Sequence, residues 1–428
     1  MRKSFLLLMA AFCLPLSAAA QMISSSAVSG RFLDLAEAYK LALVRSEEIA
    51  ISGATYEETL AKADEIFSRA TPHINLMGSE TFQDVPRGSS GLFLQRQREQ
   101  GWVNLHQPLF SGLREFLAYR ASKDFGRAAE LSLTRAQQLL YRDVARAYLD
   151  LLAAQDDIRI RGALLEITQD RVKDLQEFRR VGRARASEYL AAESQVAQQA
   201  AQLESSRAAE QVAQFKLGFL TGLEERLTPA PTPAPAAAPE LAAVLARARA
   251  RPDVESRRAE VSSAEFAIKV ASRQRWPTIA LDANYYFQRP PSFTSDVRWD
   301  AALTGSLPLY GGGEIGAQTR QQEARLRARR AAFSEILRIA EFEVKAAHQE
   351  LLASVSVTAA LDNAARLAEE NAKAQGEDYR LGQVTNLDVL GSLNTLQQTR
   401  LQQNAARIDA YWSRVRLEVA AGLPGGSL

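Results

Sequence analysis

"RLGQVTNLDVL", residues 380–390, decides the fold, because the chain writes the same pattern 200 residues earlier. The earlier stretch, residues 180–190, reads "RVGRARASEYL". In both, Arg, an aliphatic residue and Gly stand in a row, an acidic residue follows six positions after the Gly, and Leu comes two positions later. The same offset of 200 relates Pro108 to Pro308, Gly112 to Gly312, and Gly222 to Gly422. A constant offset over this length predicts a tandem duplication.

The N-terminal 20 residues are predicted to be a secretory signal peptide. Arg2 and Lys3 precede an apolar run, and the small residues "SAAA" end at Ala20, directly before Gln21. Cys13, the single cysteine of the chain, lies inside this segment. The expected product is therefore an exported protein without disulfides.

The remaining chain is predicted to consist of two repeats and a linker. The first repeat covers residues 21–227 and the second residues 240–428. Between them, residues 228–239 read "TPAPTPAPAAAP", a Pro/Ala-rich composition that favours an extended connection.

Composition narrows the class of partner. The chain has 52 Lys and Arg against 50 Asp and Glu, and removal of Arg2 and Lys3 with the signal leaves 50 of each. A balanced charge gives no support for nucleic-acid binding. The sequence beyond the signal has no run of 18 apolar residues, so we expect either a soluble exported protein or one that crosses a membrane as a β-barrel.

Two long helices are predicted from proline-free segments. Residues 111–177 and 311–377 are 67 residues each, about 100 Å at the α-helical rise. Apolar or small residues recur every three and four positions, which is the seven-residue period of a left-handed coiled coil. The shorter predicted helices, 34–71 and 187–221, together match one long helix in length, so we expect them to pack beside it end to end.

Each half is also predicted to contain a strand hairpin, at about 73–107 and about 278–307. In "TIALDANYYF", residues 278–287, alternate side chains are apolar, as in a membrane β-strand. Four strands per chain cannot close a barrel, and an open sheet edge is not tolerated in lipid. Several chains would therefore have to contribute strands to one barrel.

"PLYGGG", residues 308–313, and "YRLGQVTNLDVL", residues 379–390, together resemble the outer-membrane efflux family of TolC. The resemblance implies a mainly α fold with membrane β-hairpins, in which duplicated helix–two strands–helix–helix repeats form a homotrimer. It implies a 12-strand β-barrel in outer-membrane lipid of a Gram-negative bacterium, continued by a 12-helix coiled-coil tunnel in the periplasm. The implied function is the outer-membrane duct of efflux or type I secretion. The implied partners are a periplasmic adaptor protein and an inner-membrane transporter of RND or ABC type.

The resemblance also implies roles for particular residues. The expected adaptor-docking tips are Val181, Gly182, Arg183, Leu381, Gly382 and Gln383. The alternative for the two glycines is an ordinary helix C-cap. The expected bends between barrel and tunnel are Pro72, Pro108, Pro277, Pro308, Gly311, Gly312 and Gly313.

Asp388 and Tyr379 match the acidic pore constriction of the family and a tyrosine that holds it shut. The chain departs from the family where Gly391 replaces a second acidic residue and Val384 replaces an arginine of the gate. We therefore expect a single acidic ring. The alternative is that Asp388 is only a first-turn charge that favours its helix.

Two other classes of function fit the sequence less well. A periplasmic adaptor also has a long helical hairpin, but its β-domains would surround one hairpin and would not separate duplicated helices. An enzyme is disfavoured, since His73, His106 and His348 have no metal-ligand spacing. We expect no catalytic residues, metal or cofactor. The cargo, whether drug, metal or protein, is not encoded in these patterns.

Overall fold

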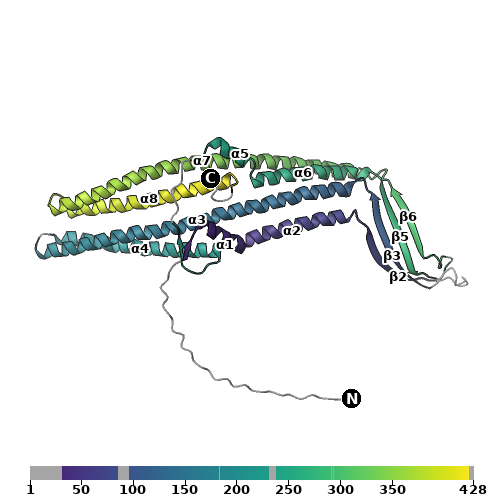
Figure 1. Ribbon diagram of the computed structural model, residues 1–428, viewed down its shortest axis with the longest axis horizontal. Coiled ribbons are helices and arrows are strands. Elements are labelled where there is room, and N and C mark those ends of the chain that lie inside the picture. The colour runs from purple at the N-terminus through teal and green to yellow at the C-terminus, as the bar shows by residue number, and fades with distance from the viewer. Residues whose placement is uncertain are drawn as a thin grey trace, which may run out of the picture.

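The computed structural model describes residues 31–84, 96–182, 184–230, 238–290, 292 and 294–423. The predicted signal peptide and most of the predicted linker lie outside these residues. The protein is a long helical body with a β-sheet inclined to it at one end and two helix–helix turns at the other (Figure 1). Within the described ranges, none of the helices combines the length and apolarity of a membrane span.

Two long helices run the length of the body. α3 covers Arg114–Arg180 and α7 covers Glu314–Arg380, 67 residues each. The predicted length is confirmed, with both helices three residues further along the chain than expected. The predicted seam runs from Gln137 to Leu151 and from Leu337 to Leu351. It is buried at Leu140, Val144, Ala147 and Leu151 and at Ala340, Val344, Ala347 and Leu351, while its first positions, Gln137 and Leu337, are partly buried.

Three shorter helices in each half lie beside the long ones. They are α1 (Leu35–Arg45), α2 (Glu47–Ser68) and α4 (Ala186–Thr221) in the first half, and α5 (Leu241–Ala248), α6 (Pro252–Ser272) and α8 (Asn386–Ala420) in the second. A 3-10 turn, η1 (Arg273–Arg275), follows α6. The single helix predicted from Asp34 to Thr71 is wrong. The chain breaks at Ser46, whose hydroxyl accepts a hydrogen bond from the Ile49 N–H and so begins α2.

The four membrane-type strands form one antiparallel sheet in the order β2-β3-β5-β6. Their bounds are β2 His73–Phe82, β3 Gln97–Phe110, β5 Thr278–Gln288 and β6 Trp299–Ser306. The central pair, β3 and β5, joins the two halves of the chain. One face carries a polar ladder in which the Asn104 amide donates to Asn284 and the Asn284 amide donates to Asp300, both at 2.9 Å.

A small second sheet fixes the middle of the first half. β1 (Arg31–Leu33) and β4 (Leu227–Pro229) pair in parallel. The Tyr148 hydroxyl donates to the carbonyl of Leu33, the last residue of β1, at 3.1 Å and to that of Ala230, which follows β4, at 2.9 Å. The first two residues of the predicted linker thus belong to a strand, which tolerates Pro229 because that residue lies at its end.

The helices form a wall with a fixed lateral order. α3 packs against α2 and α4 on one side and against α6 and α8 on the other, and α7 lies beyond α6 and α8. Ser132 on α3 meets Ser256 on α6 at 3.0 Å, while Arg329 on α7 pairs with Glu260 on α6 at 2.7 Å. The wall therefore ends with α2 and α4 at one edge and α7 at the other.

Candidate functional site: the helical turns and the bends

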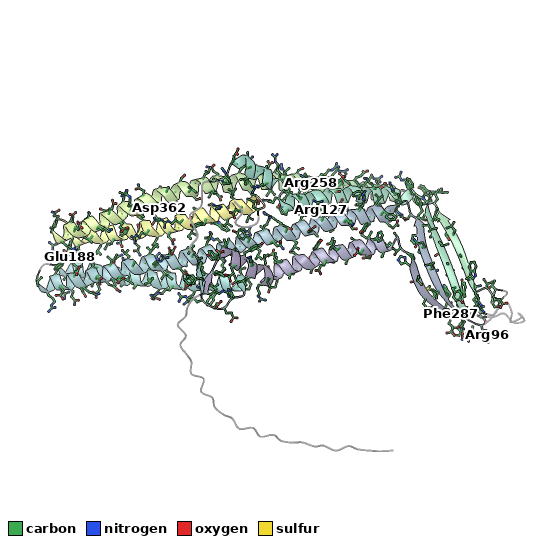
Figure 2. The ribbon with its side chains drawn as sticks, viewed as in Figure 1. Arg96, Arg127, Glu188, Arg258, Phe287 and Asp362 are labelled. Carbon is green, nitrogen blue, oxygen red and sulfur yellow. The ribbon has the colours of Figure 1, made fainter. Side chains whose placement is uncertain are left out.

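The two predicted docking turns lie at the end of the helical body that is furthest from the sheet. Figure 2 places Glu188, six residues after Gly182, at that end, and Phe287 at the far end of the sheet. α3 turns into α4 there, and α7 turns into α8. Arg183 lies outside the described residues. Val181 and Leu381 end their helices and are about 70% exposed, at 69% and 72%.

Gly182 and Gly382 are helix caps. Their φ angles are +75° and +76°, a left-handed conformation that glycine adopts without strain. In the second turn, the Gly382 N–H donates to the Tyr379 carbonyl at 3.0 Å and the Gln383 N–H donates to the Asp378 carbonyl at 2.9 Å, which is a Schellman motif. A Cβ at either glycine would meet no atom within 4 Å. Both turns therefore present open backbone, whatever they bind.

Tyr379 is held by a residue that the sequence did not reveal, Arg171 of α3. The Arg171 guanidinium lies 3.7 Å from the centre of the Tyr379 ring. Its Nε donates to the buried Asn386 side chain of α8 at 3.0 Å. Burial lowers the pKa of Arg171 below its usual value. One cation from the first half thus connects both helices of the second turn, by a stacking contact worth about 1–2 kcal/mol where water is excluded.

Asp388 lies in the first turn of α8 and forms a capping box with Thr385. Its Oδ2 accepts hydrogen bonds from the Thr385 N–H at 2.8 Å and from the Thr385 hydroxyl at 2.6 Å. These bonds favour the ionised form and lower the pKa of Asp388. The carboxylate is exposed, so the cap leaves its charge facing solvent. The local role weighed from the sequence is present, and the pore role stays a prediction.

The bends between sheet and helices use left-handed backbone in both halves. Gly312 and Gly313 have φ angles of +61° and +83° directly before α7, whereas Gly311 does not have a positive φ. In the first half the equivalent pair is Gly112, at +71°, and Leu113, at +60°. Among the described residues, Leu113 is the one non-glycine residue with a positive φ. Leucine does not favour this conformation, so its residue type did not predict the bend.

The prolines predicted at the bends occupy two kinds of position. Pro72, Pro277 and Pro308 lie in connections between helix and strand. Pro108 instead lies inside β3, opposite Ala280, next to an irregularity in the β3–β5 register. The strand continues two residues past Pro108, and an irregular register is a position where a strand tolerates a residue without an N–H.

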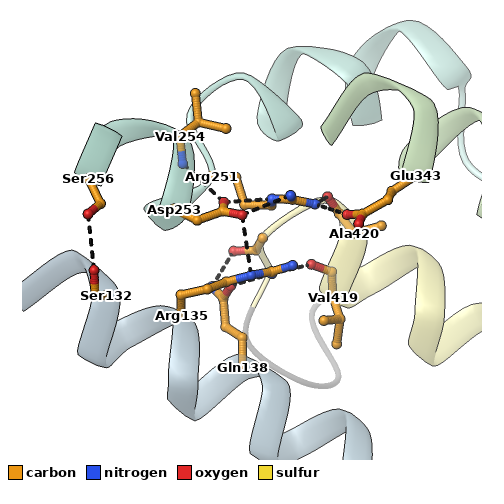
Figure 3. A network of polar contacts seen from close by, with 11 residues as sticks. Ser132, Arg135, Gln138, Arg251, Asp253, Val254, Ser256, Glu343, Val419 and Ala420 are labelled. Atoms are coloured by element: carbon orange, nitrogen blue, oxygen red, sulfur yellow. Dashed lines mark hydrogen bonds and ion pairs between the residues drawn. The ribbon is translucent and has the colours of Figure 1, made fainter. Parts of the chain in front are cut away.

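A buried ionic network secures the middle of the second half (Figure 3). Arg251, with 1% of its surface exposed, pairs with Asp253 at 2.7 Å and with Glu343 at 2.5 Å. Burial alone would lower the pKa of Arg251, but the two acidic partners outweigh it and raise that pKa. The neighbouring Arg135 donates to the Val419 carbonyl at 2.8 Å, and burial, followed by the charge of Arg251, lowers its pKa to about 10. The network joins α3, α6, α7 and the end of α8.

None of these clusters has the composition of a metal site. Within the described residues, no three His, Cys, Asp or Glu side chains gather closely enough to hold a metal ion. His106 pairs with Asp282 at 2.7 Å across β3 and β5, and His348 contacts the Pro239 carbonyl at 2.9 Å. These histidines take part in structural contacts.

Comparison with known proteins decides the family. Residues 38–223 and again residues 244–423 match the family described as "Outer membrane efflux protein". The chain belongs to the outer membrane efflux protein family. It is an outer-membrane protein, and the helical body is its periplasmic portion. Its family and its fold are those of efflux ducts rather than of enzymes. The double match also fits the duplication seen in the sequence.

Individual relatives agree with this assignment. The outer membrane efflux protein BepC of Brucella suis biovar 1 (strain 1330) is 23% identical over 345 residues, which cover 79% of this chain and 75% of BepC. The crystal structure of CusC superposes with a TM-score of 0.82 at 17% identity, over 92% of this chain and 94% of CusC. The outer membrane protein VceC of Vibrio cholerae superposes with a TM-score of 0.78 at 19% identity, over 91% and 96%.

Proposed function

We propose that three copies of this efflux protein close into one continuous duct across the outer membrane. The observation that carries this proposal is the pair of open sheet edges: β2 and β6 each pair on one side only. Large apolar side chains on one face of the sheet are exposed, namely Ile74, Leu76, Tyr285, Trp299 and Leu303. An apolar face suits lipid, but open edges do not, because their N–H and C=O groups would lack partners there. Pairing β6 of one copy with β2 of the next removes every edge and gives twelve strands.

The opposite face of the sheet fits the inside of such a barrel. It carries the Asn104–Asn284–Asp300 ladder and the His106–Asp282 pair. The helical wall also has two open edges: α2 and α4 form one, and α7 forms the other. In the proposed ring, α7 of one copy meets α2 and α4 of the next, as β6 meets β2. Cargo would move passively, driven by a transporter in the inner membrane.

The two helical turns are the proposed contact with a periplasmic adaptor, which links the duct to an RND or ABC transporter. Both turns expose backbone around a left-handed glycine, so a partner helix can approach closely. Asp388 and Tyr379 beside the second turn are the proposed constriction. In a threefold assembly, Asp388 would supply one ring of carboxylates that attracts cations.

The assembly is tested by fractionation and by electrical recording. We expect the protein in the outer-membrane fraction as a trimer that dissociates in SDS, with its N-terminus at Gln21. Reconstituted trimers should conduct ions across a planar bilayer. A stable monomer after detergent extraction, or recovery in the soluble periplasmic fraction, would refute the proposed duct.

Two kinds of substitution at the turn glycines distinguish a role in adaptor docking from a role as helix caps. Asn tolerates a left-handed conformation, whereas Val does not. If the turns dock an adaptor, replacing Gly182 and Gly382 together by Asn abolishes export and leaves trimers intact, because the added side chains block close approach. Normal export by the Asn variant, together with failed assembly of the Val variant, would show that the glycines serve only as caps.

A further inference from the structure

The two halves contain the same junction between helices in different surroundings. In the first half Ser46 alone separates α1 from α2, and Arg45 precedes it; in the second half residues 249–251 separate α5 from α6, and Arg251 is the last of them. Each Arg lies against the glycine that follows the adjacent short helix. A Cβ at Gly222 would be 3.4 Å from Arg45 Cδ, and one at Gly422 would be 2.9 Å from Arg251 Cγ. The two junctions are thus structural equivalents.

The second junction is closed by the long helix of the other half, α3. The Gln138 side chain donates to the Gly422 carbonyl at 2.8 Å, and Arg135 lies 3.7 Å from Asp253. Further along, Tyr141 and Ala145 form one buried cluster with Val415 and Val419 of α8. Because α3 and α8 are antiparallel, Ala145, seven residues after Gln138, lies level with Val415, seven residues before Gly422.

Within the described residues, the first junction has no such cover. Phe215 and Phe219 of α4, which occupy the positions of Val415 and Val419, are 75% and 79% exposed. They border a groove of about 940 Å³ that also includes Arg45 and Gly222. The side chain of Arg45 is 63% exposed, and among the described residues it pairs with one acidic side chain, that of Glu47, at 3.7 Å.

The matching surface lies on α7, at the other edge of the wall. The residues 200 positions after Arg135, Gln138 and Ala145 are Glu335, Arg338 and Lys345, and all three are exposed. None of them makes a side-chain hydrogen bond or ion pair with the described part of its own chain. This strip of α7 is therefore the unused equivalent of the strip of α3 that closes the second junction.

We infer that α7 of a second copy covers α4 and the Arg45 junction in the register that α3 has on α8. Arg338 then donates to the Gly222 carbonyl, as Gln138 does to Gly422. Glu335 supplies Arg45 with the second carboxylate that Arg251 obtains from Glu343. Lys345 lies level with Phe215 and covers its ring with the aliphatic part of the side chain. In the intrachain contact Arg135 pairs with acidic Asp253, whereas the equivalent Glu335 pairs with basic Arg45, which also pairs with Glu47.

The inference rests on the proposed ring of chains, and disulfide cross-linking tests the register. In a Cys13→Ser background, which has no cysteine, the pair Phe215→Cys and Lys345→Cys should give covalently linked chains on SDS gels after mild oxidation. The control pair, Phe215→Cys and Val357→Cys, moves one cysteine twelve residues, about 18 Å, along α7. It should give at least tenfold less linked product.

The outcomes separate the register from the duct itself. Linkage of the control pair in preference to the test pair would overturn the register, as would absence of linkage in protein that still conducts as a trimer. A monomeric, non-conducting protein would instead contradict the proposed function. Charge reversal adds an independent measurement: Glu335→Arg and Arg45→Glu should each lower the trimer fraction, and the double variant should restore it. Normal assembly of both single variants, or a double variant that assembles no better than the single ones, would also reject the contact.

Discussion

The two halves have the same elements but bury them unequally, and the difference follows the position of each helix in the wall. In the second half the short helix α8 has 17 buried residues, whereas its first-half equivalent α4 has seven. The order reverses for the long helices, since α3 has 14 and α7 has seven. α3 and α8 lie inside the wall and α4 and α7 at its edges. The surfaces that are buried in one half and exposed in the other are therefore the ones that a second copy would cover in the proposed ring.

The largest difference between the halves should appear at the paired arginines of the junctions. Arg251→Ala leaves Asp253 and Glu343 without their buried partner, so we expect a loss of about 3–5 kcal/mol in unfolding free energy. Arg45→Ala removes an exposed pair and should cost about 1 kcal/mol or less in the monomer. Denaturant unfolding of detergent-solubilised protein at one fixed concentration measures both. Equal losses would show that burial of the arginine does not determine how much each junction contributes to stability.

The bends should differ next. A Cβ at Gly112 would approach the Cβ of Trp276 to 2.9 Å, whereas one at Gly312 would meet nothing within 4 Å. Gly312→Ala therefore carries only the left-handed backbone strain, about 1–2 kcal/mol. Gly112→Ala adds an overpacking cost of about 1–3 kcal/mol. The yield of folded protein and its midpoint of thermal unfolding should fall further for Gly112→Ala, and a reversed order would contradict the close approach.

A smaller effect distinguishes the two turns. Arg171→Ala removes the stacking contact on Tyr379 and the hydrogen bond to Asn386, so the second turn should loosen by about 2 kcal/mol. Arg179→Ala is the matched control, because Arg179 lies 5.0 Å from the Tyr189 ring beside the first turn. In planar bilayers, Arg171→Ala should raise the open probability and Arg179→Ala should change it less. Identical recordings would mean that the two turns do not differ in how they are held.

The smallest effect concerns the acidic residues that occupy equal positions in the two turns, Asp388 and Glu188. Asp388→Asn should shift the reversal potential in a salt gradient toward lower cation selectivity, and Glu188→Gln should shift it less. An unchanged potential for Asp388→Asn would exclude this residue from the constriction. The hydrogen bonds from Thr385 lower the folded pKa of Asp388 below the unfolded value near 4. Its contribution to the turn is therefore present above that unfolded value and lost as pH falls through the lower folded pKa.

The features of the fold that could be predicted are those that local sequence patterns encode. The proline-free segments gave the length of the two long helices, and the repeated Arg-aliphatic-Gly pattern located both turns. It did not predict Arg171 beside Tyr379, because the two are 208 positions apart and no motif relates them. The break at Ser46 was also missed, since one hydroxyl cap is a weaker signal than the helical period around it. Comparison of "RSE", residues 45–47, with "RPD", residues 251–253, indicates the shared junction. That Arg251 is buried and Arg45 is exposed depends on how the helices pack, which these short patterns do not encode.

β3 of the first half pairs directly with β5 of the second half. One contact between unlike halves therefore forms when each chain folds. In the proposed ring, unlike halves then alternate, and only every second contact forms by association of separate molecules. Joining six separate half-repeats into one ring takes five associations, each of which costs about 4–15 kcal/mol of translational and rotational freedom, whereas three duplicated chains need two. Alternation has a further effect at the far end of the body. A partner that surrounds all six turns meets two different surfaces in strict succession, so a set of six identical adaptor molecules must bind there in two different ways.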